Sequence, residues 1–144
     1  MHDIIENSIS KKAQQHLYFL RRLRKAHLPP SILTMFYRGT IESVLSSCIT
    51  AWFGNCTVSD RKTRQRIVKT AEKIIGVSLP SITDMYTTLC IRKTNSIVDD
   101  PTHISHTLFT LMPSRKRYRR IRALTTRLCN SFFPQAIRLL NTQN

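Results

Sequence analysis

The sequence predicts an all-α fold, a small single-domain helical bundle of about four main helices with a basic, loop-rich C-terminal third. Apolar residues recur at steps of three and four along most of the chain, which is the period of an amphipathic helix. Prolines and glycines fall between these periodic segments, and no β-type alternation of useful length is present. The 144 residues suffice for one modest hydrophobic core.

The first two predicted helices lie on either side of a proline pair. Residues 4–25 carry an apolar stripe at helical steps, with basic residues gathered on the opposite face, and Pro29 and Pro30 end this helix. The stretch from Phe36 to Cys56 predicts a central helix, against which we expect the others to pack. Its apolar face is formed by Ile41, Val44, Leu45, Cys48, Ile49 and Trp52.

Two further helices are predicted in the next part of the chain. Ser59 is the expected N-cap of a helix over 60–75, and Gly76 is the expected stop after it. Ser81 and Asp84 have the spacing of a capping box, which predicts the start of the following helix.

Towards the C-terminus the helical pattern weakens. We therefore expect a helical core over 1–100 and a basic extension over 101–144 that is rich in loops. Within the extension, the run 114–122 is strongly basic, and a short last helix is predicted over 134–140 with Pro134 at its first position. So short a helix is stable only when it docks on the rest of the protein.

Positive charge is the strongest signal in the composition. The chain has 23 Lys and Arg against 8 Asp and Glu, a formal net charge of +15. The last acidic residue is Asp100, and residues 101–144 carry eight basic side chains. A polyanion is the natural partner of such a chain, and nucleic acid is favoured over a membrane surface.

Two basic clusters are candidate nucleic-acid-binding sites. The first is a stripe on one face of helix 60–75, with spacings suited to contact successive phosphates: Lys62, Arg66, Lys69 and Lys73. The second lies in the run 114–122 and combines cations with a ring on which a base could stack: Arg115, Lys116, Arg117, Tyr118, Arg119 and Arg120. The alternatives are a solvated helix face for the stripe, and a disordered loop or nuclear-localisation patch for the run.

The motifs of the common enzyme classes are missing. Three isolated glycines cannot supply a Gly-rich phosphate loop or the first turn of a methyltransferase. Asp99 and Asp100 superficially resemble a polymerase aspartate pair, but they end a predicted helix and not a strand of a palm domain. Cys90, His103 and His106 are weak candidates for zinc ligands whose spacing fits no standard finger. We therefore expect no enzyme activity, no metal and no cofactor.

The cysteines and the N-terminal residues indicate the cellular compartment in which we expect the protein. The four cysteines form no close pair, and neither a secretory signal nor a membrane span is evident. We expect an intracellular protein of the nucleus or cytoplasm, with free thiols and without a membrane partner.

Several long strings carry a family resemblance: FYRGTIESVLSSCITAWFGNC (36–56), SLPSITDMY (78–86), HISHTLFTLMPSRKRYRRI (103–121) and CNSFFPQAIRLLN (129–141). They resemble the segment that follows the reverse-transcriptase palm in LINE-type, non-LTR retrotransposon polyproteins of vertebrates. Many relatives carry glycine where this chain has Arg115. The same segment is similar to the AlkB homologue eight N-terminal domain.

The two resemblances imply different contexts. The first implies a thumb-like helical region that holds RNA or DNA of the template–primer type beside the palm domain of a parent polyprotein. The second implies an accessory N-terminal domain of an AlkB-type tRNA-modifying 2-oxoglutarate dioxygenase/methyltransferase. We expect a non-catalytic helical module that contacts the nucleic-acid backbone electrostatically and binds no small-molecule substrate. The AlkB-type accessory domain, a protein-interaction domain with a solvated basic face, and a non-functional remnant are the alternatives.

Overall fold

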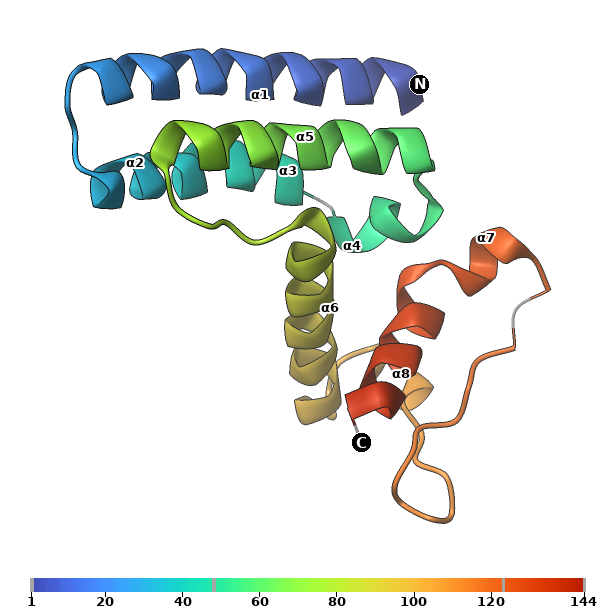
Figure 1. The fold of residues 1–144 in the computed structure, drawn as a ribbon. Coiled ribbons are helices and arrows are strands. Elements are labelled where there is room, and N and C mark those ends of the chain that lie inside the picture. The colour runs from blue at the N-terminus through green and yellow to red at the C-terminus, as the bar shows by residue number, and fades with distance from the viewer. Residues whose placement is uncertain (1, 48, 123, 144) are drawn as a thin grey trace. The chain divides into compact units, whose positions relative to one another are not determined.

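The computed structural model describes residues 2–47, 49–122 and 124–143, and over these residues it confirms the all-α fold (Figure 1). The one β feature of the described part is an isolated antiparallel bridge between Leu111 and Tyr118. Backbone contacts divide the chain into two compact units. The first takes the chain up to Ser47 and from Thr57 to Met85, and the second takes the remainder. This division differs from the predicted one at residue 100, because the segment after Ser47 groups with C-terminal residues.

The first unit is built from helices that run along one another. Figure 1 shows α1 and α5 side by side in the same direction, with the chain between them returning in the opposite direction. The elements of this unit are α1 (His2–Lys25), α2 (Pro30–Tyr37), η1 (Arg38–Glu42), α3 (Ser43–Ser46) and α5 (Val58–Ile75). Their predicted apolar stripes meet in a core that includes Ala13, Leu17, Leu20, Leu33, Tyr37, Ile41, Leu45, Ile67, Val68, Ala71 and Ile75.

The predicted continuous central helix is wrong. The chain forms a π-helical turn over Arg38–Glu42 and leaves helical geometry at Ser47, where ψ is 119°. A side-chain hydroxyl competes here with the backbone amides for a carbonyl oxygen. Thr40 Oγ1 donates to the Phe36 carbonyl at 2.5 Å. Hydrogen bonds of this kind bend helices. The spacing of apolar residues is the same with or without such a bend, so it did not predict the bend. Of the predicted apolar face, Cys48 lies outside the described residues.

The start of α5 corrects a second expectation. Thr57, and not Ser59, is the N-cap residue, because its hydroxyl oxygen accepts the Asp60 amide at 3.1 Å. The Asp60 carboxylate in turn accepts the Thr57 amide at 3.4 Å, which completes a reciprocal capping box. The helix therefore begins earlier than predicted, at Val58.

The end of α5 follows the prediction. Gly76 has a φ of 84°, a left-handed conformation that favours glycine, and its amide donates to the Glu72 carbonyl at 2.7 Å. The Arg24 guanidinium donates to the Ile74 carbonyl, so the last turn of α1 also satisfies the end of α5.

Helix α6 (Ile82–Asp99) starts in the first unit and continues in the second. Ser81 caps it as predicted, because its hydroxyl oxygen accepts the Asp84 amide at 3.1 Å. The Gln65 side chain also accepts the Ile82 amide at 2.9 Å, which ties α5 to this helix start.

The second unit packs aromatic side chains around the later turns of α6. The Phe53 and Tyr86 rings stack with centroids 4.2 Å apart, and Phe109 contacts Phe133 at 6.0 Å. A Cβ on Gly54 would collide with the backbone oxygen of Asn130, so this position requires glycine. The remaining elements are α4 (Ile49–Trp52), η2 (Phe53–Asn55), η3 (His106–Leu108), α7 (Thr126–Cys129) and α8 (Phe132–Gln143).

The last helix is longer than predicted. It begins at Phe132, which places Pro134 at the third position of its first turn and not at the first. Proline is tolerated there because the first amides of a helix have no carbonyl partner within it. Among the described residues, none of the helices combines the length and the apolar character needed to cross a membrane.

The two candidate caps of α5 can be distinguished by matched substitutions. Thr57→Ala should lower the free energy of unfolding by about 1 kcal/mol, because the Asp60 amide loses its acceptor. Ser59→Ala should change it by less than about 0.5 kcal/mol, since this exposed side chain caps nothing. Urea denaturation of both variants measures the difference, and a larger loss for Ser59→Ala would contradict the assignment.

Candidate nucleic-acid interface

The predicted basic run forms the turn and the second arm of a short hairpin in the second unit and continues beyond it. Around the Leu111–Tyr118 bridge, the Met112 amide donates to the Arg117 carbonyl at 2.9 Å. The Arg119 amide donates to the Thr110 carbonyl at 2.7 Å. These pairs fix the register of residues 110–119, so the run is ordered by backbone hydrogen bonds and is not a featureless loop.

The turn of this hairpin contains a backbone conformation that favours glycine. Arg115 has a φ of 58°, and its amide donates to the Met112 carbonyl at 2.8 Å. A side chain at positive φ is a steric cost that glycine avoids. Glycine at this position would avoid that cost, whereas Arg115 adopts the conformation with a strained backbone.

Asn141 on α8 attaches the hairpin to the helix. Its side-chain oxygen accepts the Tyr118 amide at 2.8 Å, and its side-chain nitrogen donates to the Tyr118 carbonyl at 3.1 Å. One carboxamide thus satisfies both backbone groups of Tyr118, as a neighbouring strand would do. We call this pair of bonds the Asn141 clamp.

The Tyr118 ring is half-buried and packs edge-on against Phe109, with centroids 6.3 Å apart and planes at 86°. This contact anchors the hairpin in the aromatic core of the second unit. The stacking of a base on this ring stays a prediction, and the contact that the structure shows for the ring is the packing against Phe109. Its neighbours Arg117 and Arg119 are exposed.

Helix α8 adds a further cation from the opposite side of the clamp. It buries Ala136, Ile137 and Leu140. Arg138 and Thr142 are exposed and share one face with Asn141, since residues three and four apart lie together on a helix. This face therefore meets the hairpin through Asn141 and presents Arg138 beside it.

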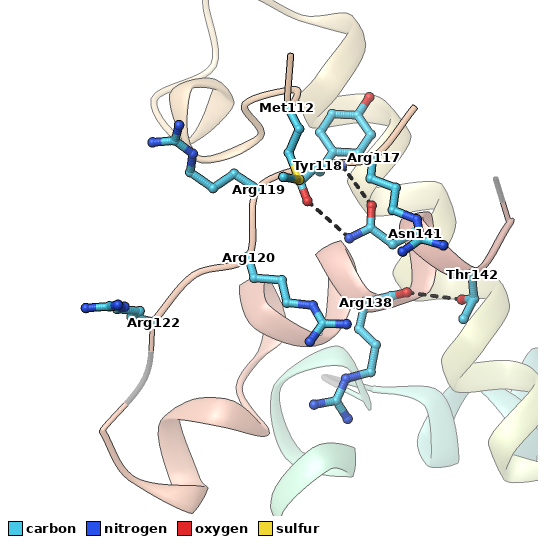
Figure 2. Close-up of a pocket in the computed structure, with 9 residues that line it drawn as sticks. All are labelled: Met112, Arg117, Tyr118, Arg119, Arg120, Arg122, Arg138, Asn141 and Thr142. Carbon is cyan, nitrogen blue, oxygen red and sulfur yellow. Dashed lines mark hydrogen bonds between the residues drawn. The ribbon is translucent and has the colours of Figure 1, made fainter. Parts of the chain in front are cut away.

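Together the hairpin, the segment after it and α8 line an open hollow of about 650 Å³ (Figure 2). We call it the arginine hollow, and its lining consists of Met112, Arg117, Tyr118, Arg119, Arg120, Arg122, Arg138, Asn141 and Thr142. Figure 2 shows the side chains of Arg120 and Arg138 extending toward the same region. Both also line a smaller adjoining hollow, of about 80 Å³, with Ile121, Cys129 and Pro134.

The arginine hollow carries a strong positive potential. Five arginines belong to its lining, and a guanidinium stays charged at all relevant pH values; Figure 2 shows the side chains of Arg119 and Arg122 extending away from those of Arg120 and Arg138. No carboxylate belongs to its lining, and none of the five arginines forms an ion pair with a described residue. An anion that enters the hollow is therefore met by planar donors suited to phosphate.

The structure reassigns part of the predicted set. It brings Arg117, Tyr118, Arg119 and Arg120 together in the hollow and leaves Arg115 and Lys116 at the exposed turn. Sequence reasoning did not select Arg122, Arg138, Asn141, Met112 and Thr142. Arg122 belongs to the basic run itself, whereas a link between Arg138 and the run depends on how α8 docks, which has no local sequence signal.

The second predicted cluster lies in the first unit. Lys62, Arg66, Lys69 and Lys73 are all exposed on one face of α5, as the spacing predicts. The Lys69 ammonium lies 3.6 Å from the Glu72 carboxylate, which reduces the local charge. This stripe is convex helix surface, so it provides cations without enclosing a ligand.

The weak zinc candidates are not brought together. Cys90 is buried on α6, and burial raises the pKa of its thiol, against the effect of hydrogen bonding with Tyr86 and Thr94. The His103 ring accepts the Ser105 amide, and His106 Nδ1 lies 3.1 Å from the Ile97 carbonyl oxygen. Within the described part of the chain, no three His, Cys, Asp or Glu side chains form a group that could hold a metal.

Asp100 has a local structural partner. Its carboxylate accepts the hydroxyl and the amide of Thr102, at 2.5 and 3.0 Å, and these hydrogen bonds lower the pKa of the carboxyl group. The residue thus closes the turn after α6.

Comparison with known proteins gives one family match. Residues 3–43 match the family described as "Alkylated DNA repair protein alkB homolog 8, N-terminal". The matched segment covers less than a third of the chain and comprises most of α1 with α2 and η1. It supports the AlkB-type resemblance and gives no support to the retrotransposon one. Comparison with curated proteins and with solved structures gives no significant match.

The Asn141 clamp is testable by its effect on one backbone amide. Asn141→Ala should speed hydrogen exchange of the Tyr118 amide and lower the free energy of unfolding by about 1–3 kcal/mol, because two partly buried backbone groups lose their partners.

Gln143→Ala, at an exposed position near the end of the same helix, is the matched control and should leave Tyr118 exchange unchanged. Exchange followed by NMR measures both variants. An unchanged Tyr118 rate in Asn141→Ala would show that the clamp does not hold the hairpin.

Proposed function

We propose that this chain is a non-catalytic helical module that binds the backbone of RNA or DNA through the arginine hollow. The observation that carries the proposal is that five arginines, from the hairpin, the segment after it and α8, belong to the lining of one acid-free hollow, with Arg120 and Arg138 extending toward the same region (Figure 2). Repulsion among these cations is relieved when polyanion phosphates enter. Bidentate guanidinium–phosphate pairs make nucleic acid a better fit than a diffuse anionic surface.

The recognition is expected to be backbone-directed. The carboxamide of Asn141 is engaged by Tyr118, and the Thr142 hydroxyl donates to the Leu139 carbonyl at 2.7 Å. These uncharged polar side chains are thus engaged within the protein, and most of the remaining polar side chains of the lining are arginines, which bind any phosphate. Affinity with little sequence preference follows.

The family match favours one biological context over the other. A segment similar to the alkB homolog 8 N-terminal family suggests an accessory domain beside an AlkB-type tRNA-modifying enzyme. In that setting the arginine hollow would help to hold the nucleic acid, while other domains supply the chemistry. Turnover of 2-oxoglutarate or S-adenosylmethionine by the isolated chain would contradict the non-catalytic part of this proposal.

The α5 stripe is a secondary candidate for backbone contact. Its four exposed cations are spaced along one helix face, but no concave surface surrounds them and Lys69 is close to Glu72. Binding through the stripe alone would resemble weak contact with a solvated basic face.

The dependence of affinity on salt tests the proposal. For about four phosphate contacts, affinity for single-stranded RNA should fall roughly tenfold for each doubling of salt. The double variant Arg120→Gln/Arg138→Gln should lower the log–log slope by about 1.4, because each lost contact removes about 0.7. Fluorescence anisotropy at about 50 and about 200 mM salt measures the slope.

A matched control removes the same charge elsewhere. Arg21→Gln/Arg92→Gln changes two exposed arginines that lie outside the hollow, and it should alter the slope much less. Equal slopes for the two double variants would show that the protein binds by net charge alone. Affinity without salt dependence would contradict backbone binding altogether.

A further inference from the structure

We infer that the arginine hollow accommodates one unpaired nucleotide, so that the protein prefers single strands to duplexes. This inference rests on the proposed function and deepens it. It depends on a feature that phosphate contact does not require, namely an open apolar side chain among the cations. That side chain is Met112, which is 45% exposed and belongs to the lining.

The size of the hollow favours more than a phosphate group. Its volume of about 650 Å³ lies within the range of about 300–1,000 Å³ found for small-molecule sites. Phosphate contact alone needs only a surface of donors, as on the α5 stripe. A concave space of this volume admits a sugar and a base together with their phosphate.

The lining offers two kinds of surface in one place. Arg120 and Arg138 supply donors for phosphate, and Met112 supplies exposed apolar surface, while the Tyr118 ring extends away from these two arginines and packs against Phe109 (Figure 2). A methionine thioether makes favourable contacts with aromatic rings, and every nucleobase has such a ring. Since Arg120 and Arg138 also line the adjoining hollow, they can contact the phosphates on both sides of an inserted base.

A duplex cannot use this combination. In a paired stack the faces of each base are covered by its neighbours, so only base edges and the backbone are accessible. A duplex would reach the arginines through its phosphates and would leave Met112 without a partner. An unpaired nucleotide that turns out of its stack can contact both surfaces at once.

The hydrogen-bonding groups indicate tolerance of base identity. Asn141 is engaged in the clamp, and the Thr142 hydroxyl is bonded to backbone carbonyls of its own helix, at 2.7 Å for Leu139. Part of the hydrogen-bonding capacity of each side chain is thus committed within the protein, which leaves fewer groups to read a base edge. The hollow should therefore select the unpaired state more strongly than the sequence.

The test compares two ligands of equal charge. A labelled oligo-U RNA of about 12 nucleotides should bind about tenfold more tightly than a blunt-ended, fully paired RNA duplex with the same total number of phosphates. Fluorescence anisotropy at matched salt measures both dissociation constants. Equal, salt-sensitive affinities would overturn this inference and leave the proposed function intact, whereas absence of binding to either RNA would overturn both.

Substitution of Met112 isolates the apolar contact. Met112→Ala should weaken oligo-U binding about fivefold, leave duplex binding unchanged and preserve the salt slope, because no phosphate contact is lost. Leu111→Ala is the matched control, since Leu111 is similarly exposed, at 46%, and does not line the hollow. Equal losses for the single strand and the duplex in Met112→Ala would contradict an inserted base.

The Met112→Ala substitution could weaken binding by disturbing the hairpin or by removing the contact with the base, and two further measurements distinguish these effects. Met112→Leu keeps an apolar side chain of similar size and should retain oligo-U affinity within about twofold. Hydrogen exchange at the Tyr118 amide reports whether the hairpin is still held in each variant. Slow exchange in Met112→Ala together with weaker oligo-U binding supports the inference. Slow exchange with unchanged oligo-U binding overturns it.

Discussion

The attachment of the hairpin to α8 through Asn141 is the interaction on which the candidate site depends. The segment from Pro113 to Arg122 is strongly cationic, and left to itself it would spread its charges through solvent. The two hydrogen bonds from one carboxamide fix Tyr118 against the helix. Arg117, Arg119 and Arg120 are then placed around the same space as Arg138. Neutral polar bonds thus hold mutually repelling cations together.

Aromatic packing supports this arrangement from within the second unit. Tyr118 contacts Phe109, which contacts Phe133 at the start of α8, so the hairpin and the helix share one aromatic cluster. The Lys93 ammonium lies 4.5 Å from the centroid of the Phe132 ring, a cation–π contact that joins α6 to the same helix. The short last helix is stable because it docks, as its length requires.

The family match and the proposed binding site rest on different parts of the chain. The match ends at residue 43, within the first unit, whereas the arginine hollow belongs to the second. The AlkB-type context is therefore supported by sequence in the first unit. Nucleic-acid binding is supported by physical chemistry in the second, and each can be tested without the other.

Sequence periodicity predicted the helices that bury apolar residues of one face over several turns. It did so for α1, α5 and α6, and it predicted Gly76 and Ser81 as helix ends because their chemistry is local. It missed the break at Ser47, since the apolar period runs through the π-helical turn without change.

The candidate site was predictable only in part. The basic run was evident, but its partners Arg138 and Asn141 lie about twenty residues away on a helix that looks like an ordinary amphipathic segment. Their role follows from docking geometry, which depends on long-range contacts that no local pattern encodes. The capping of α5 by Thr57 was missed because Ser59 offered an equally plausible local signal.

The most direct test of the account is an NMR titration of the ¹⁵N-labelled protein with single-stranded RNA, observing arginine side-chain Nε–Hε signals and backbone amides. We expect the largest shifts at Arg120 and Arg138 and at the Tyr118 amide, with smaller shifts along the α5 stripe. Shifts confined to Lys62, Arg66 and Lys73, with the signals of the hollow unchanged, would contradict the arginine hollow as the binding site.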